Sequence, residues 1–226
     1  QGVVAMGKIL EEHHKEAMMW DVERGVPDRP QEKYWQTCTC IGSWHYSETS
    51  YRNGWYKSAS QVISMLVDIV SKNGNMLLSV PLRADGTPDE KEIAIMKEFG
   101  AWMKINSESI VKTRPWKIFG EGPIADADIQ INAQGFNDGQ YTKAGANEIR
   151  FTQTEKNLYV SALEWPENKT INVKSLAEGS TLYPEKIKSV ELLGYGKVKF
   201  TRTSDALVVS LPEKLNNIMP VLKIKK

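Results

Sequence analysis

The chain has 226 residues, which is long enough to bury a hydrophobic core and allows one or two domains; we predict two. Its 29 Lys and Arg residues nearly balance 28 Asp and Glu residues, so a formal net charge of +1 gives no electrostatic reason to expect nucleic acid or an acidic membrane as a partner. No apolar stretch approaches the ~20 residues that span a bilayer, and the N-terminus lacks the pattern of a signal peptide.

The first predicted elements are two strands and a loop. Residues 17–22 form a short apolar run that predicts a buried strand, whose C-terminal end carries Asp21 and Glu23. After a proline-rich loop, residues 35–41 predict a second strand, closed by Gly42. A polar loop rich in aromatic residues follows. It contains Trp44, His45 and Tyr46.

Two helices with a strand between them come next. Ser58 and Gln61 form the Ser-x-x-Gln capping pattern, and Asn73 and Gly74 supply a left-handed end to the first helix. Residues 75–80 predict a buried strand, after which Thr87, Pro88 and Glu90 suggest a second capping box. The inner face of the second helix is predicted to comprise Ile93, Met96, Phe99 and Met103. The alternation of strands and helices with short connections indicates parallel strands covered by helices.

Beyond about residue 116 the apolar pattern changes to period two. About seven short segments alternate apolar and polar residues, and turn residues separate them. This pattern predicts an antiparallel β-sandwich of about 100 residues. Residues 118–123, with two glycines and a proline, are the predicted linker. The residues predicted to face the sandwich core are Phe151, Val160, Val173, Phe200 and Val209.

Cysteine and histidine residues give no metal-site pattern. Cys38 and Cys40 lie two apart on a predicted strand, so they face the same side, and geometry disfavours a disulfide between them. His13 and His14 are adjacent and project in different directions. We therefore expect no metal and no cofactor.

Residues 66–116, "LVDIVSKNGNMLLSVPLRADGTPDEKEIAIMKEFGAWMKINSESIVKTRPW", carry a long ordered set of motifs. Upstream, "YWQTCTCIGSWHY" combines a Trp, a polar strand, a Gly and an aromatic loop that ends in Tyr. Together with the predicted sandwich, these segments resemble the retaining α-L-fucosidase family of glycoside hydrolases over essentially the whole chain. Two departures are Ser79-Val80-Pro81, where many members have Asn-Val-Gly, and Asn106-Ser107-Glu108, where many have Asn-Gly-Glu.

The resemblance implies a fold of two parts. Residues 1–118 correspond to the C-terminal part of a catalytic (β/α)8-like barrel, and residues 119–226 to a C-terminal antiparallel β-sandwich domain. A complete barrel needs about 250 residues, so most of it would lie in a missing N-terminal portion. The family's nucleophile, an aspartate in a Trp-x-Asp type motif on an earlier strand, has no matching position here. The chain alone is therefore expected to be inactive.

The segment "MWDVERG" resembles the family's segment that carries the general acid/base, with Glu23 as the glutamate. Retaining glycosidases need two carboxyl groups about 5 Å apart, one as nucleophile and one as general acid/base. The alternative is that Glu23 forms an ordinary solvated ion pair with Arg24 or another neighbour. Asp21 is expected either to support Glu23 or to end the strand through backbone hydrogen bonds.

Trp44, His45 and Tyr46 are candidates for binding the sugar by stacking or hydrogen bonding, and packing of their loop is an equal alternative. The implied substrate is a fucosylated glycan, and the implied compartment is extracellular, periplasmic or lysosomal. A competing hypothesis is a non-catalytic carbohydrate-binding or scaffolding module. A third is another barrel glycosidase that keeps Glu23 and acts on a different sugar.

Overall fold

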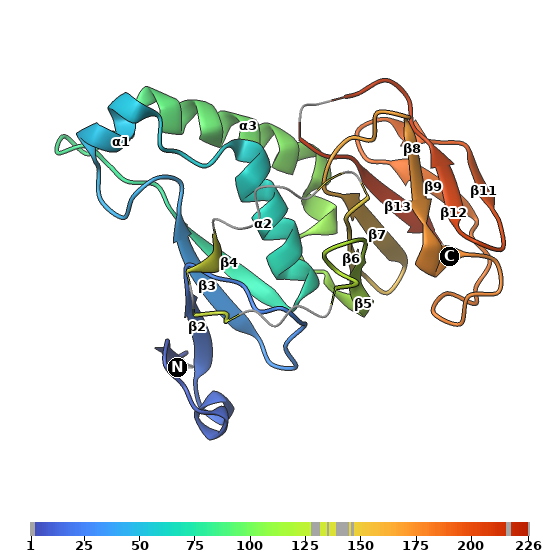
Figure 1. Ribbon diagram of the computed structural model, residues 1–226, viewed down its shortest axis with the longest axis horizontal. Coiled ribbons are helices and arrows are strands. Elements are labelled where there is room, and N and C mark those ends of the chain that lie inside the picture. The colour runs from blue at the N-terminus through green and yellow to red at the C-terminus, as the bar shows by residue number, and fades with distance from the viewer. Residues whose placement is uncertain are drawn as a thin grey trace. The chain divides into compact units, whose positions relative to one another are not determined.

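A computed structural model describes residues 3–127, 132–134, 136–138, 145, 147–215 and 218–225. The chain divides into two compact units, one of residues 1–101 with 130–142 and the other of residues 102–129 with 143–226. Figure 1 shows their helices and strands in chain order by colour. Within the described residues, no helix is both long and apolar enough to cross a membrane.

The first unit contains a four-stranded parallel sheet in the order β1-β2-β3-β4. Its strands are β1 (Met6–Gly7), β2 (Met19–Glu23), β3 (Trp35–Cys40) and β4 (Gly74–Ser79). The last three confirm the predicted strands and their parallel direction, whereas the two-residue β1 was not predicted. A short 3-10 helix, η1 (Glu12–Glu16), joins β1 to β2.

Helix α2 (Ala59–Ser71) makes the crossover from β3 to β4, and Figure 1 shows it lying along the sheet. Ser58 and Gln61 form the predicted reciprocal capping box, and Asn73 has a φ of 70°, as the predicted left-handed end requires. Met65 and Ile69 on its inner face pack against Trp35 and the apolar side of β2. This packing covers one face of the sheet.

The loop after β3 contains a helix that was not predicted, α1 (Glu48–Asn53), which Ser47 caps through its side chain. Helix α3 (Glu90–Asn106) follows β4, and the division between the two units falls within it. The 3-10 helix η2 (Ser107–Ser109) continues from α3.

The predicted capping box of Thr87 and Glu90 is wrong. Asp85 accepts hydrogen bonds from the backbone N–H and the hydroxyl of Thr87, at 2.9 and 2.7 Å, so Thr87 belongs to the preceding turn. Asp89 and Glu92 instead cap α3 reciprocally, with the Asp89 side chain 2.8 Å from the Glu92 N and the Glu92 side chain 3.2 Å from the Asp89 N. Ile93, predicted on the inner face, is exposed.

The second unit is a β-sandwich, as the alternating pattern predicts. One sheet has the strand order β10-β9-β13-β7-β6-β5 and the other has β11-β12-β8, all in antiparallel pairs. The strands are β5 (Arg114–Glu121), β6 (Ile149–Gln153), β7 (Asn157–Ala162), β8 (Thr170–Val173), β9 (Ser189–Leu192), β10 (Gly196–Lys197), β11 (Phe200–Arg202), β12 (Leu207–Ser210) and β13 (Val221–Lys225). A 3-10 helix, η4 (Lys174–Leu176), follows β8.

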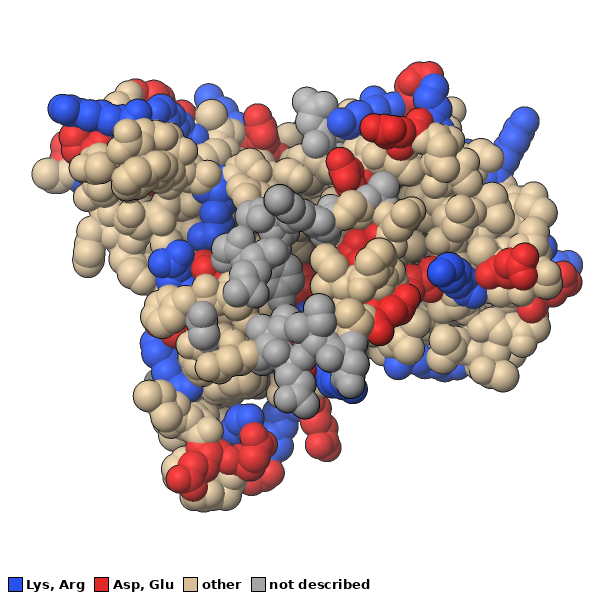
Figure 2. Space-filling view, in the orientation of Figure 1, with Lys and Arg blue, Asp and Glu red and all other residues tan. Residues whose placement is uncertain are grey.

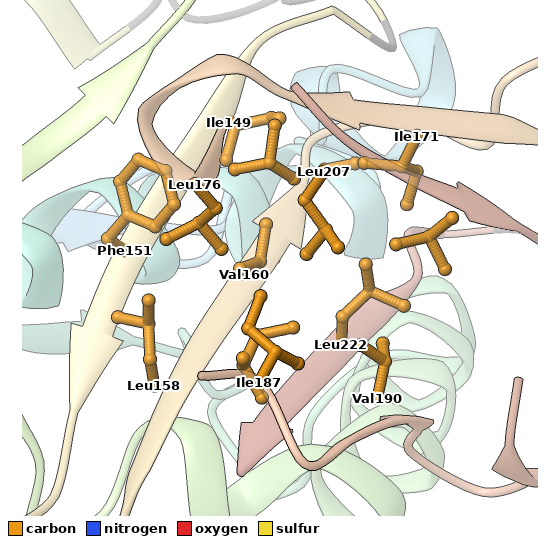
Figure 3. Packing of buried hydrophobic residues seen from close by; sticks show 14 of the residues in the cluster. Ile149, Phe151, Leu158, Val160, Ile171, Leu176, Ile187, Val190, Leu207 and Leu222 are labelled. Atoms are coloured by element: carbon orange, nitrogen blue, oxygen red, sulfur yellow. The ribbon is translucent and has the colours of Figure 1, made fainter. Parts of the chain in front are cut away.

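The core of the sandwich contains the predicted inward-facing residues, and Figure 3 shows how its side chains meet between the strands. Phe151, Val160, Val173 and Val209 are fully buried, and Phe200 packs against this cluster while partly buried. Trp116 of β5 packs against Phe151 with ring centroids 4.9 Å apart and the ring planes tilted by 57°.

The predicted linker at residues 118–123 is largely strand, because β5 continues to Glu121 and pairs with β6. Gly120 pairs with Arg150 and Glu121 with Ile149 after an irregularity in the register. The position between residues 118 and 119 thus lies within a strand of the sandwich. The assignment of residues 1–118 to a barrel and 119–226 to a separate domain stays a prediction.

Candidate active site

The parallel sheet of the first unit has one apolar and one polar face. Alternation along β2 sends Val22 into the core under α2 and sends Asp21 and Glu23 to the opposite face. On that face Gln36 of β3 donates to the Asp21 carboxylate at 3.4 Å, and Asn75 of β4 donates to Gln36 at 3.4 Å. A band of polar side chains therefore crosses three strands.

Glu23 is the last residue of β2, at the carboxyl end of the strand. Its side chain, 23% exposed, forms an ion pair with Lys8, which follows directly after β1. Lys8 also lies 3.3 Å from the Asp21 carboxylate and 2.9 Å from the Cys38 sulfur. Cys38 lies opposite Glu23 in the sheet register, with its sulfur 3.5 Å from the carboxylate.

Lys8 is the centre of this cluster. Partial burial works against its charge, but hydrogen bonds with Cys38, Glu23 and Asp21 outweigh that effect and raise the pKa of its ammonium above the usual range. One permanent positive charge thus serves two carboxylates at the end of β2. The cluster thus places a partly exposed carboxylate, that of Glu23, in direct contact with a lysine ammonium.

The aromatic loop begins after β3, at the same edge of the sheet as Glu23, because parallel strands end at a common edge. Trp44 is 40% exposed and His45 is also exposed. The Tyr46 hydroxyl donates to the Glu48 carboxylate at 3.1 Å, and the Arg83 guanidinium lies 5.7 Å from the centre of the Tyr46 ring. These contacts share no residue with those of Glu23.

A second charged cluster lies directly beyond Glu23 and was not predicted. Asp138, almost fully buried, contacts the Arg24 guanidinium at 3.2 Å, the Lys57 ammonium at 3.1 Å and the Thr39 hydroxyl at 2.8 Å. Burial disfavours the charge on Arg24, yet the hydrogen bond and charge of Asp138 raise the pKa of this guanidinium. The ion pair of Arg24 is therefore with Asp138, whereas Glu23 pairs with Lys8.

The face of the molecule drawn in Figure 2 carries basic and acidic side chains intermixed, in keeping with a formal net charge of +1. Among the described residues, no group of three or more His, Cys, Asp or Glu side chains is arranged to hold a metal ion. Cys38 and Cys40 are both buried free thiols. Burial raises the pKa of the Cys40 thiol, which keeps it in the neutral form.

Comparison with known proteins decides the family. Residues 2–108 match the family model described as "Alpha-L-fucosidase", and residues 143–225 match that described as "Alpha-L-fucosidase C-terminal domain". The chain belongs to the α-L-fucosidase family. Members of this family are glycoside hydrolases. Both compact units thus contain a stretch that matches the fucosidase family.

Individual fucosidases agree with the family match. The chain is 27% identical over 201 residues to a tissue α-L-fucosidase of Macaca fascicularis, covering 86% of this chain and 36% of that protein. An α-L-fucosidase of Dictyostelium discoideum is 37% identical over 93 residues, which cover 41% of this chain and 20% of that protein. A solved α-L-fucosidase structure shares the fold with a TM-score of 0.69 and 24% identity, covering 93% of this chain and 43% of that one.

The chain thus spans well under half the length of the fucosidases to which it is similar. Its sheet-rich second unit contains the stretch that matches the C-terminal domain of the family. Residues between the two matched stretches, from 109 to 142, include Gln134, Asn137 and Asp138, whose side chains contact the strand that carries Glu23 or the turn after it.

Proposed function

We propose that this chain is the C-terminal part of an exo-acting, retaining α-L-fucosidase that hydrolyses terminal α-L-fucosyl linkages in glycans. The observation that carries the proposal is the place of Glu23, a partly exposed carboxylate at the carboxyl end of a parallel strand, on the polar face of its sheet. Barrel enzymes place their active sites at this end of their strands. The names of the fucosidases to which the chain is similar support the choice of sugar.

We assign the four parallel strands to a (β/α)8-like barrel whose earlier strands lie in a preceding portion of the protein. Parallel sheets are normally covered on both faces, with helices on one side in a barrel and side chains of other strands on the inside. Here α2 covers one face, while Asn75 and Leu77 of β4 are exposed. The polar face then lines the interior of the barrel, and the preceding portion is the partner that closes it.

In this assignment Glu23 is the general acid/base, and the nucleophile is an aspartate upstream of this chain. The nucleophile attacks the anomeric carbon while Glu23 gives its proton to the leaving oxygen. The Glu23 carboxylate then takes a proton from water, which attacks the same carbon and releases the nucleophile. Lys8 stabilises the negative charge that Glu23 carries between the two steps, because it is paired with that carboxylate.

We assign substrate binding to Trp44, His45 and Tyr46. Their loop starts at the edge of the sheet where Glu23 lies, and Trp44 and His45 are exposed residues. A partly exposed indole ring provides a flat apolar surface on which the apolar face of a sugar can stack. The Tyr46 hydroxyl, held by Glu48, has an acceptor lone pair left for a sugar hydroxyl.

The replacement Glu23→Ala tests the proposal in the polypeptide that carries this chain together with its preceding portion. Hydrolysis of natural fucosides should fall by about 10²- to 10⁴-fold, because a poor leaving group needs the proton. An aryl fucoside with an acidic phenol should still form the glycosyl-enzyme and then stall for want of a base. Azide, which attacks without a base, should restore turnover.

Glu191→Ala is the matched control. Glu191 pairs with Lys225 at 2.7 Å and is 22% exposed, close to the 23% of Glu23, but it lies in the sandwich. The Glu191→Ala replacement should leave the rates on both kinds of fucoside unchanged. The chain expressed by itself should not hydrolyse the aryl fucoside, since the nucleophile is upstream. Equal losses on both kinds of substrate with no effect of azide, or turnover by the chain alone, would contradict the proposal and favour a non-catalytic role.

A further inference from the structure

The carboxyl end of β2 is held by a segment more than a hundred residues away in sequence, which we call the clamp segment (residues 132–134 and 136–138). Gln134 makes the contact nearest to Glu23. Its side-chain oxygen accepts from the Glu23 backbone N–H at 2.9 Å, and its amide nitrogen donates to the carbonyls of Lys8 and Asp21 at 2.6 and 3.3 Å. The clamp segment and β2 belong to the same compact unit.

Gln134 takes the place of a neighbouring strand. The backbone groups of Met19, Asp21 and Glu23 point toward β1, since the Met19 N–H donates to the Ala5 carbonyl, whereas the Arg24 N–H donates to Cys38 of β3. However, β1 ends at Gly7, so its ladder does not extend to Glu23. A side-chain amide has one acceptor and one donor group, like a peptide group, and it continues the ladder where β1 stops.

Asn137 and Asp138 hold the next residues in the same way. The Asn137 amide accepts from the Val26 N–H at 2.9 Å and donates to the Val26 carbonyl at 3.1 Å. The Asp138 N–H donates to the Arg24 carbonyl at 3.0 Å, and its carboxylate pairs with the Arg24 guanidinium. Asn137 and Asp138 are only 2% and 3% exposed, so these bonds are protected from water.

The turn immediately after Glu23 depends on this support. Arg24 has a φ of 47°, a left-handed conformation that costs a non-glycine residue about 1 kcal/mol or more unless its surroundings hold it. Gly25 leaves the space for the clamp segment: a Cβ there would lie 1.8 Å from the Ala133 carbonyl oxygen. The backbones of Gly25 and Ala133 are therefore in close contact, and a side chain at residue 25 would force one of them to move.

We propose that the clamp segment positions the Glu23 carboxylate for proton transfer, with Gln134 as the main positioning residue. The proposal rests on the assignment of Glu23 as the general acid/base. Gln134 fixes the backbone of Glu23 itself, while Asp138 and Asn137 fix the turn that follows it, at Arg24 and Val26. The clamp segment lies outside both stretches that match the family models, so neither match assigns it a role.

The test uses Gln134→Ala and the isosteric Gln134→Glu in the complete enzyme. The second variant keeps an oxygen for the Glu23 N–H but loses the donor for Lys8 and Asp21. With a weakly acidic phenol as leaving group, kcat/KM should fall about tenfold to a hundredfold, the loss typical of a misplaced catalytic group. With a strongly acidic phenol, kcat/KM should stay within about twofold, because bond cleavage then needs no acid.

Two further variants separate positioning from general damage. Gly25→Ala, which displaces the Ala133 carbonyl without removing a hydrogen-bonding side chain, should reproduce the dependence on leaving group. Gln153→Ala removes another side-chain amide, which donates to the Pro115 carbonyl in the sandwich at 3.0 Å. This variant should leave kcat/KM unchanged with both phenols. Losses of equal size on both phenols in the Gln134 variants, or no loss on either, would overturn the positioning role.

The Glu23→Ala enzyme distinguishes this failure from that of the proposed function. If Glu23→Ala is sensitive to the leaving group and responds to azide while the Gln134 variants do not discriminate, the acid/base assignment stands and the positioning role is refuted. If Glu23→Ala itself does not discriminate between leaving groups, the acid/base assignment fails and the positioning role fails with it.

Discussion

Replacing Asp138 with Asn removes one negative charge from a nearly solvent-free cluster while keeping the shape of the side chain. The Asp138 carboxylate forms ion pairs with Arg24 and Lys57, at 3.2 and 3.1 Å, and accepts a hydrogen bond from the Thr39 hydroxyl at 2.8 Å. An Asn amide oxygen still accepts from Thr39. The two cations lose their negatively charged partner. Lys57, only 14% exposed, keeps its 2.8 Å hydrogen bond to the Cys40 carbonyl but becomes an uncompensated, poorly solvated charge.

The expected cost follows from this exposure. Removing one partner of a fully buried ion pair costs about 3–5 kcal/mol, because it leaves an uncompensated charge. Asp138 is 2% exposed at its side chain, but Arg24 is 33% exposed and recovers part of its hydration. We therefore expect Asp138→Asn to destabilise the first unit by about 2–3 kcal/mol, mostly through Lys57.

Urea titration with hydrogen exchange on peptides from β2 and β3 measures the first unit separately from the sandwich. Lys57→Met serves as the second arm of a double-mutant cycle, because it removes the cation that Asp138→Asn leaves unpaired. The double variant should recover about 1–2 kcal/mol relative to the sum of the single losses. A loss below about 0.5 kcal/mol for Asp138→Asn, or additive losses in the cycle, would refute the reasoning.

Two further predictions concern stability. Burial and the nearby charge of Asp89 raise the pKa of Glu92 above its usual value of 4.5, so the folded state holds the proton more tightly than the unfolded state does. Glu92 therefore destabilises the fold once the pH exceeds the pKa of Glu92 in the unfolded chain. Glu92→Gln should therefore raise the urea midpoint relative to the unchanged protein by an amount that grows as the pH rises above about 4.5, and a constant difference would contradict this. Phe151→Ala should cost the sandwich about 3–5 kcal/mol, and the half-buried Phe200→Ala clearly less, in thermal unfolding of the second unit.

Much of the fold could be predicted because its signals are local. The alternation in Phe151, Val160, Val173 and Val209 predicts a strand with a buried side, and each of these residues is in the sandwich core. Ser58 and Gln61 fix the start of α2 through two hydrogen bonds between residues three apart. Such patterns need only neighbouring residues, so the sequence contains them in full.

The missed elements depend on partners far away in the chain. A strand as short as β1 shows no periodicity, and Lys8 cannot be assigned to Glu23 before the sheet order is known. No local pattern marks Asp138, and the residues that bury it and pair with it lie more than eighty positions earlier in the chain. For Glu23 itself, the resemblance supplied the expected role, the apolar run before it predicted its place at a strand end, and the structure confirms that place.

The first compact unit is discontinuous in the sequence, since residues 130–142 return to it after the chain has begun the second unit. Protein engineers who exchange C-terminal domains between fucosidases would naturally cut near residue 118, at the boundary that the sequence predicts. Such a chimera would take Gln134 and Asp138 from the donor while keeping Glu23 and Arg24 from the recipient. Exchange of the C-terminal part of this chain at residue 118 would therefore replace a piece of its first unit as well, whereas a crossover after residue 142 keeps each set of partners together.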